Sequence, residues 1–360
     1  MGMDDPENVL RSYDLDRITI GTLGSHSALN ILRGARDEGF RTVCISKSES
    51  AIIYERFKVA DELIIIPEFK SLLDEKIQKR LVENNTILIP HGSFNAYIGP
   101  ERLIDRLMVP LFGNRELLRW ETDREKQLIL LREAGLKTPR SIDDPGGIEG
   151  LTMVKFPGAK GGRGYFIARD RVDFQRKMED MSRRGLLKPE DRERLHLQEY
   201  ILGVPIYPSY FRSVIRDSVE LLAMDRRYES AVDGIGRIPA RDQLQLDLNP
   251  TYTVVGNFPI VAREMLLKDF IIMGDSIVRA SERLVPPGLI GPFCLETIVK
   301  DDLSIVAFEI SARIVAGTNV GIGGFPYAYL LHGEGMYMGR RIALEIKEGI
   351  ASNRLDLLVS

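Results

Sequence analysis

The sequence has little of what marks secreted or zinc-binding proteins. Its 360 residues include two cysteines and four histidines. Cys44 and Cys294 lie in apolar, strand-like contexts, which favours buried free thiols over a disulfide and indicates a reducing, cytoplasmic setting. HxxxH and CxxC spacings are absent, so a zinc site has little support.

Long uncharged apolar runs and a signal-peptide pattern are absent as well, which argues against a membrane-spanning or exported chain. The formal net charge of -3 gives no general attraction to nucleic acid or to an anionic membrane. Any anion-binding site must therefore be local. A hydrophobic content of 44% is that of an ordinary globular protein, and the length predicts two or three subdomains.

What the chain does have is a glycine-rich basic stretch at Met153–Ala168, MVKFPGAKGGRGYFIA. Lys155 lies on the first of two strand-like runs, and Lys160 and Arg163 lie in the loop between them. Glycines let backbone N–H groups approach an anion, and the cations add charge, so polyphosphate is the expected ligand. A Walker A loop or a Rossmann turn would lead into a helix, whereas this stretch returns to a strand. We interpret it as a hairpin lid over phosphates, with an ordinary β-turn as the alternative.

Strand-like and helical patterns alternate up to residue 90, which predicts a parallel sheet covered by helices. The expected strands are Arg17–Leu23, Arg41–Ser46, Ala60–Ile66 and Asn85–Pro90. Ligands of such sheets bind beyond the carboxyl ends of the strands. The turns Ser25-His26 and His91-Gly92-Ser93 follow the first and fourth strands, so we expect them to share this edge. They could contact an anionic ligand or simply cap helices, and both interpretations stay open.

The middle of the chain combines helices with antiparallel strands. The expected helices are Glu121–Gly135, Val172–Arg184 and Leu266–Leu284. A strand is expected over His196–Gly203, and antiparallel strands fill Val204–Val261. The segments Asp225–Ser230 and Gly236–Gln243 are interpreted as polar loops. Their candidates for substrate contact are Arg226, Arg227, Glu229 and Arg237, with a plain surface role as the alternative for each.

Two apolar runs, Gly291–Val299 and Leu303–Arg313, predict a β-hairpin near the end of the chain. Each run contains one carboxylate, Glu296 and Glu309. Burying a carboxylate in an apolar run is energetically costly unless a cation lies beside it. Two carboxylates that bind one Mg²⁺ would both be compensated in this way. In the alternative, one glutamate pairs with Arg313 and the other is exposed at an edge.

These features together resemble the ATP-grasp superfamily, which has a lysine on a strand, a glycine-rich phosphate lid, a hinge strand and later strand carboxylates. Several sequence blocks further resemble the archaeal PurP family, from Ile18 to the end of the chain. They begin at Gly21, Pro90, Phe112, Asp225, Arg237 and Gly291. The resemblance implies an α/β (α+β overall) protein, with an N-terminal parallel-sheet domain at 1–120 on the substrate-nucleotide side. An ATP-grasp fold would follow. Its small subdomain, at 121–205, would carry the lid, and its large subdomain, at 206–360, would carry the metal site.

The resemblance also implies a reaction of purine (IMP) biosynthesis. A formate-dependent FAICAR synthetase is a C–N ligase that converts ATP, formate and AICAR, the aminoimidazole carboxamide ribonucleotide, to FAICAR, ADP and phosphate through formyl phosphate. The implied ATP-binding residues are Lys155, Gly161, Gly162, Arg163, Gly164, Glu199, Tyr200, Ile201 and Glu229. AICAR would contact His26, Ser93 and Asn257. Mg²⁺ or Mn²⁺ would bind Glu296 and Glu309, with Lys155 and Arg313 as catalytic residues.

The resemblance also implies a homo-oligomer, a trimer or hexamer. The cysteines and the net charge add the expectation of a cytoplasmic protein with no nucleic-acid or membrane partner. Two positions depart from the pattern. Ser311 stands where many ATP-grasp enzymes have Asn, and the loop Gly321–Tyr327 lacks an Asn that is common in the PurP family. Two alternatives therefore remain. The chain could be a related ligase for another acid or amine, or a non-catalytic nucleotide-binding protein. A dehydrogenase is disfavoured because the turn at Gly24 lacks the GxGxxG pattern.

Overall fold

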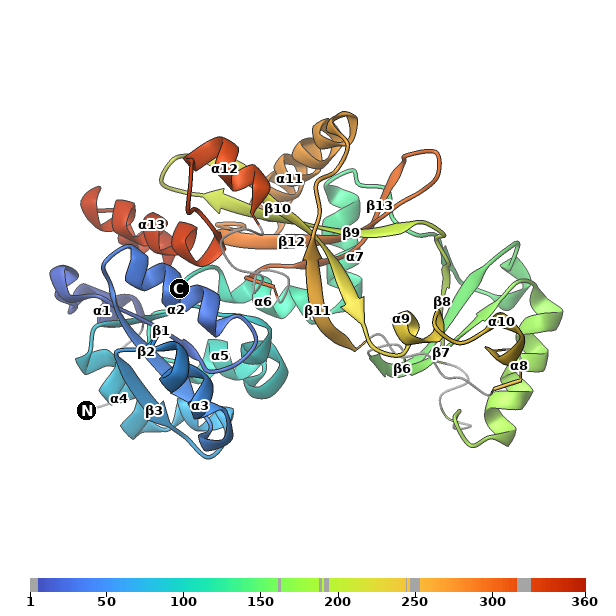
Figure 1. Ribbon diagram of the computed structural model, residues 1–360, viewed down its shortest axis with the longest axis horizontal. Helices are drawn as coiled ribbons and strands as arrows, with labels where there is room; N and C mark the ends of the chain where they lie inside the picture. The colour runs from blue at the N-terminus through green and yellow to red at the C-terminus, as the bar shows by residue number, and fades with distance from the viewer. Residues whose placement is uncertain are drawn as a thin grey trace.

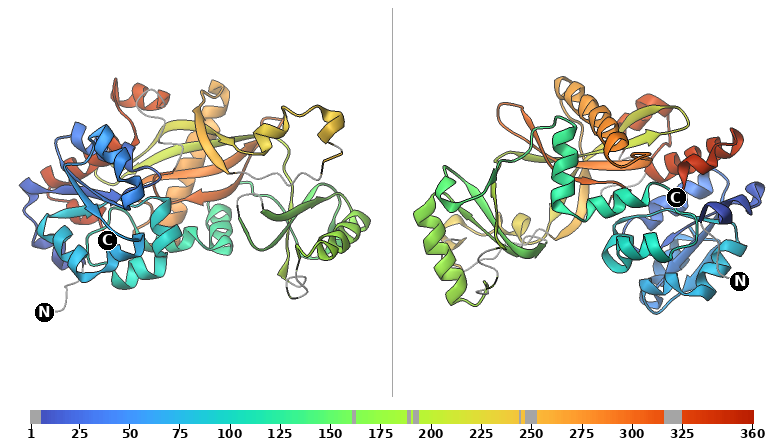
Figure 2. Two further views of the ribbon diagram at one scale, coloured as in Figure 1. Left: turned by 60° about the horizontal axis from the view of Figure 1, so that its bottom comes forward. Right: turned by 180° about the vertical axis from the view of Figure 1, so that it is seen from behind.

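The chain folds around three β-sheets (Figure 1). The computed structural model describes residues 6–160, 163–187, 190, 194–243, 245–246, 253–315 and 325–360. A parallel sheet lies at one end, a five-stranded antiparallel sheet lies in the middle, and a smaller antiparallel sheet lies at the other end. Figure 2 shows the smaller sheet and its helix standing apart from the main body. The predicted mixed α/β fold is confirmed.

The N-terminal sheet has four parallel strands in the order β3-β2-β1-β4. The strands are β1 (Thr19–Leu23), β2 (Arg41–Ser46), β3 (Glu62–Ile65) and β4 (Thr86–Leu88). The helices around it are α1 (Pro6–Arg11), α2 (Ala28–Asp37), α3 (Ser48–Phe57), α4 (Glu75–Glu83), α5 (Pro100–Arg106) and α6 (Arg115–Glu121). Every residue of β1 is buried, because helices cover the sheet. The expected parallel sheet is confirmed, and both cysteines are buried free thiols.

The last helix, α13 (Met338–Ala351), returns to the N-terminal part of the chain and packs on α2. Two glycines allow this close approach: a β-carbon on Gly34 would lie 2.1 Å from the carbonyl carbon of Gly339. The Gly339 N–H also donates to the Asn30 side chain at 2.7 Å. The end of the chain thus closes over its beginning, as Figure 1 shows.

The central sheet has the order β11-β10-β9-β12-β13 and is antiparallel throughout. Its strands are β9 (Val204–Ser213), β10 (Ser218–Glu229), β11 (Val254–Pro259), β12 (Gly291–Val299) and β13 (Ile305–Ser311). The helices α7 (Arg124–Glu133), α11 (Glu264–Leu284) and α12 (Pro326–His332) pack on it. Phe270 of α11 is fully buried, and Tyr210 stacks on Phe293 at 4.9 Å, so this face holds the core. The predicted hairpin is confirmed as β12–β13.

The smaller sheet has the order β5-β8-β6-β7. It consists of β5 (Ser141–Ile142), β6 (Thr152–Lys160), β7 (Arg163–Ala168) and β8 (His196–Glu199), and α8 (Arg171–Arg183) covers it. Phe166 of β7 meets Phe174 of α8 at 6.0 Å. The hairpin predicted over residues 153–168 is confirmed as β6–β7, although Gly161 and Gly162 lie outside the described residues.

Four sequence expectations differ from the structure. The helix predicted over Glu121–Gly135 is present as α7, but it begins only at Arg124, because α6 ends at Glu121 and Asp123 caps α7 by accepting from two backbone N–H groups. The polar loop predicted at Asp225–Ser230 is wrong, because β10 continues to Glu229. Two short helical segments, α9 (Val232–Ile235) and α10 (Ala240–Gln243), occupy the region expected to be a second polar loop. The strand expected over His196–Gly203 already ends at Glu199.

The longest helix, α11, carries charges along its 21 residues. In the part of the chain that the structure describes, no helix combines the length and the apolar character needed to cross a bilayer.

Candidate active site

Glu296 on β12 and Glu309 on β13 lie directly opposite each other. Opposed residues of an antiparallel pair project from the same face, so both carboxylates lie on one face of the central sheet, which we call the cleft face. Glu296 is buried, whereas Glu309 is exposed to solvent, although many protein atoms lie around it. The charge of Glu296, followed by this partial loss of hydration, raises the pKa of Glu309 to about 8. Repulsion between the two carboxylates therefore favours a proton on Glu309 near pH 7.

Arg227 of β10 is the counter-ion of Glu296. Its Nη1 donates to Glu296 Oε2 at 3.0 Å, and its Nη2 contacts the other carboxylate oxygen. The guanidinium also lies 4.0 Å from the centre of the Tyr207 ring. The alternative interpretation is therefore wrong in its ion pair, because Arg227 and not Arg313 pairs with Glu296. Its second part is confirmed, because Glu309 is exposed on the edge strand β13.

Arg313 instead pairs with Glu121, at the end of α6. Its Nη2 lies 2.8 Å from Glu121 Oε1, and the other carboxylate oxygen accepts from the Ala312 N–H at 2.8 Å. This pairing fixes Arg313 beside the turn that follows β4. A β-carbon placed on Gly92 would lie 3.5 Å from Arg313 Cζ and 3.0 Å from His26 Nε2. Arg313 and His26 therefore meet at the position of this glycine.

The two Ser/His turns share one edge of the parallel sheet, as predicted. The Ser93 hydroxyl donates to the Ser25 hydroxyl at 3.0 Å, and the rings of His26 and His91 stack with centroids 5.3 Å apart. His91 Nε2 lies 2.9 Å from the Leu23 carbonyl, and burial lowers its pKa to about 4. Burial also lowers the pKa of His26 to about 2. Both imidazoles are thus neutral near pH 7 and can accept or donate hydrogen bonds without charge.

Lys155 of β6 approaches the same cleft from the smaller sheet. Its Nζ donates to Gln198 Oε1 at 3.0 Å. Burial and the neighbouring charge of Arg124 lower the pKa of Lys155, whereas the carboxylate of Glu309 raises it. The charges of Lys155 and Glu309 therefore interact across the cleft.

The other predicted residues lie around this centre. Glu199 ends β8, and Tyr200 and Ile201 begin the link to β9. Asn257 of β11 is in register with Arg227, and Glu229 lies two residues further along β10, so both share the cleft face. Arg163 and Gly164 begin β7, where only their backbone is described. The segment 321–324 of the predicted substrate loop lies outside the described residues, as do Gly161 and Gly162.

Three cleft residues escaped the sequence analysis: Glu121, Gln198 and Asp225. Asp225 is 2% exposed, and burial raises the pKa of its carboxyl to about 7. Within the described ranges, no cation pairs with it. The sequence carried no clear signal of this strand, because residues 225, 226, 227 and 229 are all charged and a polar–apolar alternation is absent.

Comparisons with known proteins were made for the whole chain. Residues 20–142 match the family model "Protein of unknown function (DUF1246)", and residues 173–360 match "Domain of unknown function (DUF1297)". The chain is 52% identical to the 5-formaminoimidazole-4-carboxamide-1-(beta)-D-ribofuranosyl 5'-monophosphate synthetase of Archaeoglobus fulgidus, over 98% of this chain and 97% of that protein. It is 48% identical to the protein of the same name from Methanocaldococcus jannaschii, over 99% of both chains.

Solved structures agree with these relatives. The crystal structure of an IMP biosynthesis protein PurP from Thermococcus kodakaraensis matches with a TM-score of 0.74 and 31% identity, over 95% of this chain and 100% of that one. The N5-carboxyaminoimidazole synthetase of Staphylococcus aureus complexed with ADP shares the fold, with a TM-score of 0.57 and 16% identity over 83% of this chain and 71% of that one. The chain therefore belongs to the PurP family of 5-formaminoimidazole-4-carboxamide-1-(beta)-D-ribofuranosyl 5'-monophosphate synthetases, which has the ATP-grasp fold.

Proposed function

We propose that this chain catalyses the ATP- and formate-dependent formylation of AICAR, producing FAICAR, ADP and phosphate. The observation that carries the proposal is the 52% identity, over nearly the whole chain, to a relative named as the synthetase of this product. The described cleft supports it, because two carboxylates, two arginines and one lysine converge where a phosphoryl group would be transferred.

Glu296 and Glu309 would hold the divalent ion that accompanies ATP, which we propose to be Mg²⁺, with Mn²⁺ as the second choice. The raised pKa of Glu309 supports this fit, because a bound cation would relieve the repulsion that raises it. Among the described residues, no group of three or more His, Cys, Asp or Glu side chains could hold a metal ion. Two carboxylates suffice for Mg²⁺, because nucleotide phosphates and water complete its shell. The ion would neutralise charge on the phosphates.

The remaining ATP contacts would come from the smaller sheet, from the central sheet and from the link between them at residues 199–201. We assign the phosphates to Lys155 and to the β6–β7 hairpin with Gly161, Gly162, Arg163 and Gly164. The segment Glu199–Ile201 and Glu229 would hold the base and the ribose. The position of residues 199–201, at the link from the smaller sheet to the central one, supports this assignment.

AICAR would bind opposite ATP, in contact with His26, Ser93 and Asn257. A formate oxygen attacks the γ-phosphorus of ATP, and ADP leaves. The 5-amino nitrogen of AICAR then attacks the formyl carbon, the bond from that carbon to the phosphate oxygen breaks, and the amine gives up a proton as phosphate leaves. Arg313, fixed by Glu121, would steady the developing negative charge. Neutral His26 would orient the amine without repelling it or protonating it.

The test is an incubation of the protein with ATP, formate and AICAR, with FAICAR and ADP measured by chromatography. We expect both products in equal amounts, and ADP formation that is indifferent to formate would contradict the proposal. A panel of other small carboxylates separates this enzyme from a related ligase. Glu309→Gln should abolish turnover, whereas the exposed Glu334→Gln should not.

We also propose that the protein is a homo-oligomer, a trimer or hexamer. Three consecutive exposed apolar side chains on α12 support this, because a monomer rarely leaves such a run in water. They are Tyr329, Leu330 and Leu331. Light scattering coupled to size-exclusion chromatography measures the mass directly, and a monomer would contradict the proposal.

A further inference from the structure

Asp225 of β10 is a buried carboxyl that has no role in the reaction as described so far. Its side chain is 2% exposed, and among the described residues it forms neither a hydrogen bond nor an ion pair. Burying a carboxyl without such a partner is energetically costly. A buried polar group that lacks a protein partner, next to a binding site, is the expected contact of a ligand.

A second polar group without a partner lies close to Asp225 on the cleft face. On the neighbouring strand β9, Tyr207 is directly opposite Asp225, and Ser209 is two residues further along the same face. The Ser209 hydroxyl is buried and has no hydrogen-bond partner in the part of the chain that the structure describes. Cys294 of β12 lies opposite Ser209. This part of the cleft face therefore presents a carboxyl and a hydroxyl that the protein itself leaves unsatisfied.

The titratable groups around Asp225 come from the neighbouring strands. Burial raises the pKa of Tyr207 on β9 and of Cys294 on β12, so both are uncharged near pH 7. On β11 the opposite residue is Pro259, which does not titrate. Burial also raises the pKa of Asp225 to about 7, although the charge of Arg227 on the same strand acts against this rise. The carboxyl is therefore partly ionised at neutral pH, where its ionised form can accept a proton.

Two of the segments assigned to AICAR lie next to Asp225. Asn257 on β11 is opposite Arg227, so it is one pair of residues along the cleft face from Asp225. The turn after β1 approaches from the parallel sheet, because the Ser27 hydroxyl donates to the Val315 carbonyl at 3.1 Å. Val315 in turn packs on the tyrosine of β9 and the cysteine of β12 that lie beside Asp225.

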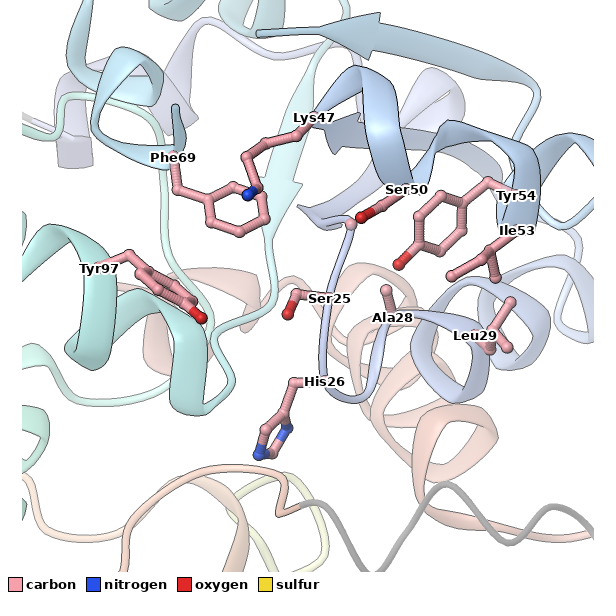
Figure 3. A pocket seen from close by; sticks show the side chains of 11 residues that line it. Ser25, His26, Ala28, Leu29, Lys47, Ser50, Ile53, Tyr54, Phe69 and Tyr97 are labelled. Atoms are coloured by element: carbon pink, nitrogen blue, oxygen red, sulfur yellow. The ribbon is translucent and has the colours of Figure 1, made fainter. Parts of the chain in front are cut away.

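His26, which precedes Ser27 in this turn, also lies toward the cleft face. It is at the edge of a cavity of about 340 Å³, and Figure 3 shows its ring extending away from Phe69 and Tyr54. Burial lowers the pKa of His26 most, and the charge of Arg227 is among the neighbouring charges that lower it further. An imidazole of AICAR in contact with His26 therefore lies near the part of the central sheet that carries Arg227.

The other groups that could take a proton from AICAR are occupied or too weakly basic. Glu296 and Glu121 are each held by an arginine, and Glu309 is assigned to the metal. His26 is too weak a base, since its pKa is lowered to about 2. Among the described carboxylates of the cleft face, Asp225 alone is neither held by a cation nor assigned to another ligand.

We propose that the Asp225 carboxylate accepts the proton that the 5-amino group of AICAR loses during formyl transfer. This rests on the proposed function. The lone pair of the amine nitrogen forms the bond to the formyl carbon, and the bond from that carbon to the phosphate oxygen breaks, with its electron pair leaving on phosphate. The N–H bond breaks toward an Asp225 oxygen, its electron pair stays on nitrogen, and the carboxyl later gives the proton to water.

Rapid-quench measurements on Asp225→Asn with ATP, formate and AICAR test the proposal. In the first turnover the variant should form ADP at a rate within about threefold of the wild type, because phosphoryl transfer to formate does not involve this proton. FAICAR should form about 100-fold more slowly, as expected when a general base is lost. Asp301→Asn, at an exposed turn, is the matched control and should change neither rate.

The pH dependence of the same step gives a second readout that needs no variant. The wild-type rate of FAICAR formation should rise as the pH increases toward about 7 and then level off, because Asp225 must be ionised to accept the proton. Asp225→Asn should lack this rise. A wild-type rate that is independent of pH between about 5 and 8 would overturn the proposal.

Three results with Asp225→Asn would also overturn it. They are FAICAR formation as fast as in the wild type, an equal slowing of ADP and FAICAR, and a raised KM for AICAR with unchanged kcat, which would indicate a binding role only. Failure of the proposed function is a distinct result, because the wild type itself would then form no FAICAR, and this assignment would fall with it.

Discussion

Arg227 and Glu296 lie 69 residues apart in the sequence and are joined by a two-pronged ion pair on the cleft face of the central sheet. Strand β9 lies between their strands, so the long Arg227 side chain crosses over Tyr207 to reach the carboxylate. This pair satisfies one of the two opposed glutamates. Under the proposed function, the cation that accompanies ATP would lower the raised pKa of Glu309, the second glutamate.

Replacing Arg227 should therefore destabilise the protein and make its stability depend on metal. Arg227→Ala leaves the buried Glu296 without a counter-ion, a change that costs about 3 kcal/mol in comparable buried pairs. Added MgCl₂ should restore part of this loss, because the ion takes over the role of the guanidinium. Thermal unfolding of variant and wild type with and without MgCl₂ measures both effects.

Arg226→Ala is the matched control, since Arg226 is exposed on the opposite face of the same strand. It should leave the melting temperature within about a degree of the wild type. An Arg227→Ala protein as stable as this control would show that the ion pair contributes nothing to the fold.

Asp225 should make the stability of the protein fall as the pH rises. Burial raises the pKa of its carboxyl from 3.8 to about 7, so the folded state binds this proton more tightly than the unfolded state. The resulting stabilisation is fully present below about pH 4 and is lost as the pH rises through about 7. Asp225→Asn removes the dependence, so at about pH 8 the variant should be the more stable protein, by on the order of 3 kcal/mol.

Urea unfolding at several pH values measures this difference. The gap between Asp225→Asn and the wild type should widen steadily from about pH 4 to about pH 7. Asp301→Asn, at the exposed turn of the β12–β13 hairpin, controls for the loss of a carboxylate. A gap that is the same at every pH would disprove the assignment.

Lys155 should act on ATP and not on AICAR. Its amine is held by Gln198 beside the cleft, so Lys155→Met removes a charged hydrogen-bond donor without disturbing the Ser/His turns. We expect the KM for ATP to rise about 30-fold or more, while the KM for AICAR changes less than about threefold. Steady-state kinetics with each substrate varied in turn give both values. The exposed Lys58→Met should behave as the wild type, and equal effects on both substrates would contradict the assignment.

Shortening the β6–β7 hairpin should uncouple ATP use from formylation. Formyl phosphate reacts with water, so a lid that excludes water protects it before the amine attacks. Deleting residues between Gly158 and Gly164 should increase the ratio of ADP to FAICAR above one. If both products fall in parallel, the hairpin serves only to bind phosphate.

The sequence predicted the elements whose pattern is local. The apolar runs around the Asp301-Asp302 turn predicted the β12–β13 hairpin. The rule for the carboxyl ends of parallel strands predicted that Ser25 and Ser93 share one edge, and their hydroxyls are hydrogen-bonded there. Contacts between distant segments gave no such signal. The packing of Gly34 on Gly339 depends on two helices at opposite ends of the chain, and no local pattern reports it.

The charged residues at the end of β10 gave a wrong prediction for a physical reason. A strand that lines a binding face carries charged residues in place of apolar ones, so Asp225–Glu229 has the composition of a loop, although its side-chain exposure alternates as in a strand. The sequence also did not indicate which arginine pairs with Glu296, because Arg226, Arg227 and Arg313 are the same type of residue. Only the register of β9 and β10 determines that Arg227 takes this role.

The most direct measurement of the central claim follows the oxygen atoms of formate. The enzyme is incubated with ATP, AICAR and [18O]formate, and the phosphate released is analysed by mass spectrometry. If formate is phosphorylated and the amine then displaces phosphate, each phosphate carries one 18O atom from formate and FAICAR retains the other. Unlabelled phosphate would contradict the account, because formate would then have reacted without ever being joined to the γ-phosphoryl group.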